Sequence, residues 1–254
     1  MEIQILASDL DGTLLNEQSQ ISKETADVIK KAQATGIHFV AVTGRAWNTA
    51  YPIFEKVGLD VDYVLLNGAQ FRTNLGEIIY EEVIETDLAE KILKYLLESG
   101  IDFEVNTDQG DFTTNTKVCA LSSKFENPTQ IIEQKIFKFF IFSDDTKQMK
   151  KMKEYLSLWQ GISVTSSSER NVEITSMKAN KGNMLKKICQ LYHVKEDEVM
   201  VFGDGENDET MFREFHHSRA MKNAVLPIQK LAERIIESNI EHGVAKEIGQ
   251  ILGG

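Results

Sequence analysis

Two acidic residues, Asp9 and Asp11, stand two positions apart directly after the apolar run Ile3–Ser8. Such a run is typical of a buried strand, and ligands of open α/β sheets bind beyond the carboxyl ends of strands. Neighbouring carboxylates repel each other unless a proton or a cation lies between them. Mg2+ takes carboxylate oxygens and accepts phosphate as a further partner, so the pair suits phosphate chemistry. Asp-x-Asp-Gly is equally typical of a surface turn, and only matching residues at other strand ends would favour the chemical interpretation.

A hydroxyl follows the next predicted strand. The apolar run 37–42 ends at Thr43, and a predicted helix at 22–34 separates this run from the first strand. The β-α-β order predicts parallel strands with a right-handed crossover. Thr43 should therefore lie at the same edge of the sheet as Asp9, although Thr43-Gly44 is also compatible with a simple turn.

The last third of the chain supplies an ammonium, an amide and further carboxylates. Lys181 opens a predicted helix, and the apolar run 199–202 leads into the segment Gly203–Asp208, which contains Asp204, Asn207 and Asp208. Each feature alone has an ordinary interpretation, as a solvated lysine or a flexible acidic loop. Together with Thr43 they provide the carboxylates for metal, the hydroxyl, the ammonium and the amide that phosphoryl transfer requires.

The pattern of elements changes in the middle of the chain. Residues 83–177 alternate two predicted helices with strands that are apolar on one face only, unlike the buried parallel strands before and after them. We therefore expect an α/β protein with a doubly wound, Rossmann-like parallel sheet core and an inserted α+β cap domain. The core should comprise residues 1–81 and 180–254, and the cap residues 82–179.

Bulk composition excludes several classes of function. The 254 residues carry 39 acidic and 28 basic side chains, for a net charge of -11, which disfavours nucleic acid as a partner. A lysine-rich stretch at 147–153 is predicted to be the solvated face of an amphipathic helix. Cys119 and Cys189 lack metal-binding spacing. No signal peptide is evident and no apolar run approaches the length that a membrane helix needs, so we expect a cytoplasmic protein without a membrane partner.

The motifs together resemble those of the haloacid dehalogenase superfamily of phosphatases. They are Asp9-Leu10-Asp11-Gly12-Thr13, Thr43-Gly44-Arg45, Lys181-Gly182 and Gly203–Asp208. Only 34 residues separate Asp9 from Thr43 (43 minus 9), but 138 separate Thr43 from Lys181 (181 minus 43). This spacing is similar to that of the Cof-type subfamily, which carries a large cap between the second and third motifs. Lys222 and Ser176 depart from the subfamily pattern, which usually has Gly and Pro at these places.

The resemblance implies a role for each motif residue. Asp9 would be the nucleophile that forms an aspartyl phosphate, and Asp11 the general acid and base. Phosphoryl oxygens would be held by Thr43, by the amides of Leu10 and Gly44, by Asn207 and by Lys181. Mg2+ would be bound by Asp9, the backbone carbonyl of Asp11 and Asp204, with Asp208 in support. Arg45 and Asn67 are weaker candidates for positioning the substrate.

The expected function is that of a Mg2+-dependent phosphatase of small phosphorylated metabolites, with sugar phosphates as the leading class. Two alternatives use similar residues: a phosphotransferase or phosphomutase on the same core, and a phosphoacceptor signalling module. The cap-sized insertion favours an enzyme, because the cap could act as a lid that excludes water. Within the cap we expect an irregular polar segment at 106–116. Its residues 106–111 could form a specificity loop or merely an exposed connection. The chain should be a monomer or a small homo-oligomer.

Overall fold

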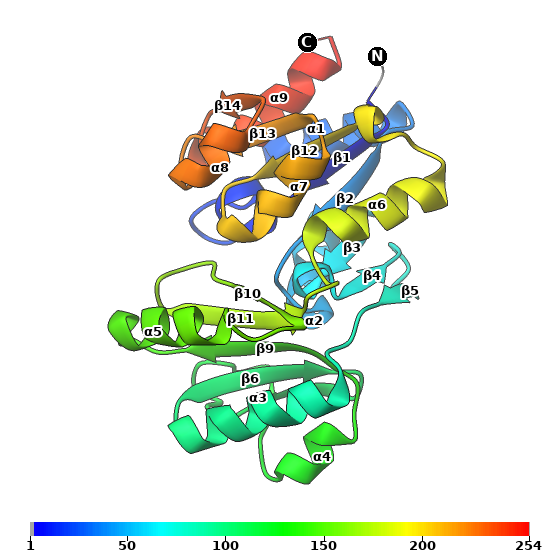
Figure 1. Cartoon of the computed structure of the whole chain (residues 1–254). Helices are drawn as coiled ribbons and strands as arrows, with labels where there is room; N and C mark the ends of the chain where they lie inside the picture. Colours follow the sequence, from blue (N-terminus) through cyan, green and yellow to red (C-terminus); the bar gives the residue numbers. More distant parts are fainter. Residues whose placement is uncertain (1–2, 254) are drawn as a thin grey trace. The chain divides into compact units, whose positions relative to one another are not determined.

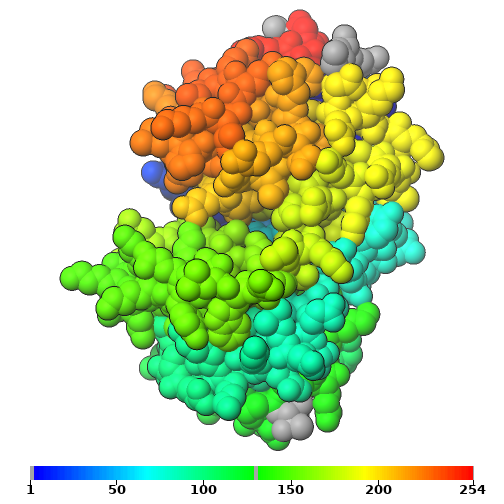
Figure 2. All heavy atoms as spheres, in the orientation of Figure 1, coloured from blue at the N-terminus to red at the C-terminus, as the bar shows by residue number. Residues whose placement is uncertain are grey.

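The computed structural model describes residues 3–253, apart from the side chains of residues 129 and 130. The chain divides into two compact units, drawn as a ribbon in Figure 1 and with all heavy atoms in Figure 2. The core unit consists of Met1–Tyr80 and Lys181–Gly254, and the inserted unit of Glu81–Asn180. Each of these divisions falls one residue from the position expected from the sequence.

The core unit contains one eight-stranded sheet with the strand order β14-β13-β12-β1-β2-β3-β4-β5. The six strands from β14 to β3 are parallel, and β4 runs antiparallel to β3. The bounds of the strands are β1 (Ile5–Ser8), β2 (His38–Val42), β3 (Asp62–Leu65), β4 (Gln70–Arg72), β5 (Ile78–Glu81), β12 (Val199–Gly203), β13 (His217–Met221) and β14 (Arg234–Ile236). The predicted α/β class with a parallel core sheet is confirmed.

The described part of the core unit also contains six α-helices: α1 (Lys23–Ala34), α2 (Trp47–Glu55), α6 (Lys181–Tyr192), α7 (Glu209–Glu214), α8 (Leu226–Leu231) and α9 (Gly243–Ile251). Ser22 caps α1, since its side chain accepts a hydrogen bond from the amide of Thr25. Pro52 is the sixth of the nine residues of α2, and this helix packs against the core through the buried side chains of Ala50 and Phe54.

The register of the central strands aligns the functional segments. β1 is fully buried between β2 and β12, and Ser8 at its end pairs with Ala41 on one side and Phe202 on the other. Because these strands are parallel, the residues that follow them emerge at one edge of the sheet. Asp9, Thr43 and Asp204 therefore start from the same edge.

The inserted unit is a six-stranded sheet with the strand order β10-β11-β9-β6-β7-β8. All neighbouring strands are antiparallel except β7 and β8. Its elements are α3 (Thr86–Ser99), β6 (Asp102–Thr107), β7 (Gly110–Thr113), β8 (Ser123–Lys124), α4 (Pro128–Ile132), β9 (Ile136–Phe142), α5 (Thr146–Leu156), β10 (Ile162–Thr165) and β11 (Asn171–Ser176). Its hydrophobic core packs α3 and α5 against strand residues such as Phe103 and Phe139.

The expected irregular segment at 106–116 is wrong for residues 106–113, which belong to two strands, β6 and β7, and the turn between them. Asn106 and Thr107 are buried residues of β6, and the chain turns directly into β7. The turn is closed by the hydroxyl of Thr107, which donates to the carbonyl of Gly110, and Gly110 has a positive φ of 131°. Polar strand residues of this kind resemble a loop in sequence, because neither face of the hairpin is continuously apolar.

No helix within residues 3–253 is long and apolar enough to span a lipid bilayer.

Candidate active site

Three carboxylates from separate parts of the core unit converge at the carboxyl edge of its sheet. Asp9 follows β1, Asp204 follows β12, and Asp208 ends the short helical turn Glu206–Asp208. One oxygen from each lies within 4.8 Å of the others. The ammonium of Lys181, the first residue of α6, lies 2.5 Å from Asp9 Oδ1 and 2.6 Å from Asp208 Oδ1. The four side chains form one cluster, and all but Asp204 are buried.

Asp208 is held on both of its oxygens. Oδ1 accepts from Lys181, and Oδ2 accepts from the backbone amides of Asp204 and Gly205 at 2.9 and 3.0 Å. A Cβ on residue 203 would lie 2.6 Å from Asp208 Oδ2, so only glycine leaves room for this carboxylate. Asp208 therefore fixes the loop that carries Asp204 and orients Lys181.

Asp204 packs directly against the turn that follows the nucleophile candidate. The hydroxyl of Thr13 donates to Asp204 Oδ1 at 2.8 Å. A Cβ on residue 12 would lie 2.3 Å from Asp204 Oδ2, and Gly12 also has a positive φ of 82°. Both the space and the backbone conformation require glycine at this position.

Two asparagines that the sequence analysis did not assign to the site hold the same turn. Asn223 donates to the carbonyl of Gly12, and Asn239 donates to the carbonyl of Leu15, each at 2.8 Å. The amide of Asn239 in turn donates to the side chain of Asn223. The signal available in sequence was the pair of polar segments after β13 and β14, at the sheet edge that carries Asp9 and Asp204.

The cluster has one positive and three negative side chains. Burial raises the pKa of Asp9 well above its usual range, against the opposing charge of Lys181. Burial and the neighbouring Asp208 raise the pKa of Asp204 to about 7. Burial alone would lower the pKa of Lys181, but the charges of Asp208 and Asp9 outweigh it and raise that pKa. The excess negative charge and the oxygen ligands fit a hard divalent cation such as Mg2+.

Asp11 lies apart from the three clustered carboxylates. Its half-exposed side chain pairs with both ends of the Arg45 guanidinium, with Nε at 2.7 Å from Oδ2 and Nη2 at 2.5 Å from Oδ1. This hydrogen bond and the charge of Asp11 raise the pKa of Arg45. Arg45, which was expected to position the substrate, thus contacts Asp11, the predicted general acid and base. The side chain of Asp11 was not expected to bind metal, since only its backbone carbonyl was a predicted ligand.

The remaining predicted residues form a connected group beside Thr43. The hydroxyl of buried Thr43 accepts from the amide of Arg45, and its carbonyl accepts from the amide of Asn67. Asn67 has a positive φ of 57°, and its side chain accepts from Asn207 at 3.1 Å. Leu10 and Gly44, whose amides are predicted phosphate ligands, directly follow Asp9 and Thr43.

The family profile of haloacid dehalogenase-like hydrolases matches residues 6–248. The chain belongs to this family. It is 30% identical to the 5-amino-6-(5-phospho-D-ribitylamino)uracil phosphatase YwtE of Bacillus subtilis, over 98% of both chains. It is 28% identical to YcsE of the same organism, a phosphatase of the same name, over 98% of this chain and 95% of YcsE. A solved haloacid dehalogenase-like hydrolase from B. subtilis superposes with a TM-score of 0.92 at 26% identity, covering 97% of this chain and 99% of that one. The predicted Cof-type phosphatase of this superfamily is confirmed.

Proposed function

We propose that this member of the haloacid dehalogenase-like hydrolases is a Mg2+-dependent phosphatase of small phosphorylated metabolites that works through an aspartyl phosphate on Asp9. The observation that carries the proposal is the buried ammonium of Lys181, which joins Asp9 to Asp208 beside Asp204. A carboxylate attacks the phosphorus of a phosphate ester poorly, because the phosphate is itself negatively charged and repels the carboxylate. One ammonium among three carboxylates leaves the site in need of a cation.

In the first step a carboxylate oxygen of Asp9 bonds to phosphorus while the bond from phosphorus to the leaving oxygen breaks. Asp11 gives its proton to that oxygen. In the second step a water oxygen attacks the same phosphorus and loses a proton to Asp11. The bond between Asp9 and phosphorus breaks, which releases inorganic phosphate and restores the free carboxylate.

The other residues of the site would bind the phosphoryl group. The hydroxyl of Thr43, the amides of Leu10 and Gly44, and the side chain of Asn207 would hold its oxygens, and Lys181 would offset their charge. Asp9, the carbonyl of Asp11 and Asp204, supported by Asp208, would hold Mg2+, which supplies the positive charge that lets a carboxylate meet a phosphate dianion.

Arg45 occupies both oxygens of Asp11 in this structure. At least one of these contacts must be released before Asp11 gives or takes a proton, because an N–H of the guanidinium occupies each carboxylate oxygen.

The substrate class we favour is the phosphate ester of a sugar or sugar alcohol. Two relatives that match 98% of this chain are named as phosphatases of 5-amino-6-(5-phospho-D-ribitylamino)uracil, whose phosphate is carried by a ribityl chain. An alkoxide is a poor leaving group, so its release needs the proton that we assign to Asp11.

A phosphate-release screen tests the proposal. The panel contains this ribitylaminouracil phosphate, common sugar phosphates, nucleotides, pyridoxal phosphate and flavin mononucleotide, each with Mg2+ or with EDTA. We expect release with Mg2+ only, fastest for sugar or ribityl phosphates, and none from the Asp9→Asn variant. Release that survives EDTA or this substitution would contradict the proposed chemistry. Analysis of phosphorylated products separates hydrolysis from transfer to another hydroxyl.

A further inference from the structure

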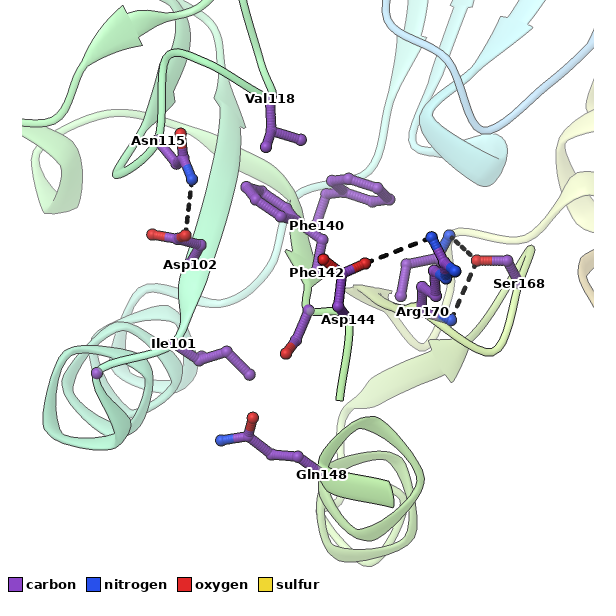
Figure 3. A pocket seen from close by; sticks show the side chains of 13 residues that line it. Ile101, Asp102, Asn115, Val118, Phe140, Phe142, Asp144, Gln148, Ser168 and Arg170 are labelled. Atoms are coloured by element: carbon purple, nitrogen blue, oxygen red, sulfur yellow. Dashed lines mark hydrogen bonds and ion pairs between the residues drawn. The ribbon is translucent and has the colours of Figure 1, made fainter. Parts of the chain in front are cut away.

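The outer surface of the inserted unit is formed by two helices that cover one face of its sheet. Figure 3 shows α3 and α5 end-on and side by side below the strands. Each helix buries one side in the hydrophobic core, α3 through residues such as Ile92 and Leu96 and α5 through Met149, Met152 and Leu156. We call the opposite, outward sides of α3 and α5 the helical face.

The middle of the helical face is aromatic. Tyr95 lies 5.3 Å from Tyr155 and 5.9 Å from Trp159 between ring centroids, and Tyr155 and Trp159 are also 5.9 Å apart. Next to them Leu158 is 80% exposed, and Tyr155 is 49% exposed. Isolated apolar residues are ordinary on a surface, but contiguous aromatic groups with an exposed leucine are typical of a protein interface.

The two ends of the helical face carry opposite charge. The first part of α5 presents exposed lysines and the first part of α3 presents exposed carboxylates, and none of these side chains makes an ion pair with a described residue: Lys147, Lys150 and Lys151, and Glu85, Asp87 and Glu90. Of the other charged residues of these helices, Lys94 pairs with Glu98 at 3.9 Å, and Glu154 is a further exposed carboxylate of α5. Asp145 caps α5, and Lys91 lies over the ring of Trp159.

The two charged groups lie at opposite ends because the helices are antiparallel. Tyr95 contacts Tyr155, whereas Leu88, seven residues earlier, approaches Gly161, six residues later. At the other end, Gln148 lines the same cavity as Gly100, which follows α3 (Figure 3). The lysines therefore lie beside the end of α3, and the carboxylates beside the end of α5.

We propose that the helical face is the surface through which two copies of this chain associate. A two-fold axis through the aromatic cluster would place the three lysines of each copy against the three carboxylates of the other, and would bury both aromatic clusters together. The same patch then serves both partners, as an isologous dimer requires. A polyanion such as nucleic acid or an acidic membrane fits less well, because half of the charged residues on this face are acidic.

The area of the helical face determines how tightly we expect the two copies to associate. The 14 residues of α3 span about 21 Å, and two helices about 10 Å apart present a flat area of roughly 400 Å². This is about half of what each partner contributes to a standard stable interface, so the dimer should be in equilibrium with monomers at micromolar concentrations.

Sedimentation velocity of the full chain, from about 1 µM to about 300 µM, tests the proposal. We expect the average mass to rise from monomer towards dimer over this range. Leu158→Asp should weaken the dimer at least about tenfold, because it places a charge at the centre of the interface. The monomer should keep its melting temperature, since this side chain is largely exposed. A chain that stays monomeric throughout, or a dimer unaffected by Leu158→Asp, would overturn the proposal.

A charge exchange provides the sharper test. The variant Lys150→Glu with Lys151→Glu and the variant Asp87→Lys with Glu90→Lys should each fail to self-associate, whereas their equimolar mixture should form heterodimers. The matched control is Lys31→Glu with Lys230→Glu, two exposed lysines of the core unit, which changes the net charge equally and should leave the wild-type equilibrium intact. Loss of association in the control, or no heterodimer in the mixture, would count against the proposed surface.

Discussion

The core unit contains two clusters of charged side chains, some of them buried, and the two differ in their balance of positive and negative charge. At the carboxyl edge, three carboxylates share the single ammonium of Lys181. Between β13, β14 and α9, two arginines meet two glutamates: Arg219 contacts Glu247 and Glu233 at 2.5 Å each, and Arg234 also contacts Glu247. The second cluster is neutral within itself. The first has excess negative charge, a balance that suits a bound cation.

The direction of the pKa shifts shows the same difference. In the balanced cluster, burial alone would raise the pKa of Glu233, but hydrogen bonding to Arg219 outweighs it and lowers that pKa. In the site, burial raises the pKa of Asp9 and Asp204, and Lys181 does not compensate. We therefore expect substitutions in the balanced cluster to reduce stability, and substitutions in the site to reduce activity.

The largest effect should come from Asp9→Asn. The substitution removes the nucleophile, so we expect kcat to fall at least about 1000-fold in a Mg2+-containing assay with p-nitrophenyl phosphate. It also removes one of three like charges, so the metal-free protein should melt at the same temperature or higher near pH 8. Substantial activity in a well-folded variant would remove the nucleophile assignment, and a large loss of stability would show that Asp9 has a structural role.

Arg219→Met should produce the opposite pattern. It leaves the buried carboxylate of Glu247 without its partner on β13, which typically costs about 3–5 kcal/mol of unfolding free energy. Urea denaturation measures this loss, while kcat per folded molecule at a temperature below the transition should stay near the wild-type value. A variant with normal stability but impaired catalysis would contradict the distinction between the two clusters.

Asp11→Asn should discriminate between leaving groups. p-Nitrophenolate leaves without protonation, whereas a sugar alkoxide needs an acid, so the loss in kcat should be about 100-fold greater for the sugar phosphate. The measurement compares both substrates under the same saturating conditions. Equal losses on the two substrates would argue against Asp11 as the general acid.

The smallest effect should be a pH dependence of metal stabilisation. The pKa of Asp204 is about 7 in the folded chain, against about 4 for an unfolded aspartate. Between these values the unfolded state loses its proton while the folded state keeps it, so the unfolding free energy of the metal-free protein falls as pH rises.

Mg2+ takes the place of that proton, so it should raise the melting temperature by a few degrees more at pH 8 than at pH 5. Differential scanning fluorimetry with Mg2+ or EDTA measures this difference. In the Asp204→Asn variant, the melting temperature should depend less on pH and less on Mg2+ than in the wild type. An equal Mg2+ effect at both pH values would indicate that the ion binds outside the cluster.

Most of the core could be predicted from sequence, because its signals are local. Buried parallel strands such as 199–202 are apolar throughout, and the functional residues follow them directly, so strand ends placed Asp9, Thr43 and Asp204 at one edge. The family resemblance then supplied the roles, since residue types alone do not distinguish a nucleophile from a metal ligand.

The features that sequence missed depend on distant contacts or on short elements. Asn223 lies 211 residues from Gly12, and no local pattern reveals that hydrogen bond. The pairing of Asp11 with Arg45 depends on side-chain directions after two different strands. Residues 106–113 of the β6–β7 hairpin resemble a loop in sequence because most of them are polar. Asn106 and Thr113 are buried by the neighbouring strands and not because they are apolar.

The position of β1 has a consequence for synthesis on the ribosome. β1 is made first, yet one of its two neighbours is β12, whose residues are translated almost 200 positions later. Until then one edge of the central strand lacks its native partner, and such edges promote aggregation of nascent chains. The turn after Asp9 is completed later still, because Asn239, which donates to the carbonyl of Leu15, follows β14 in the chain.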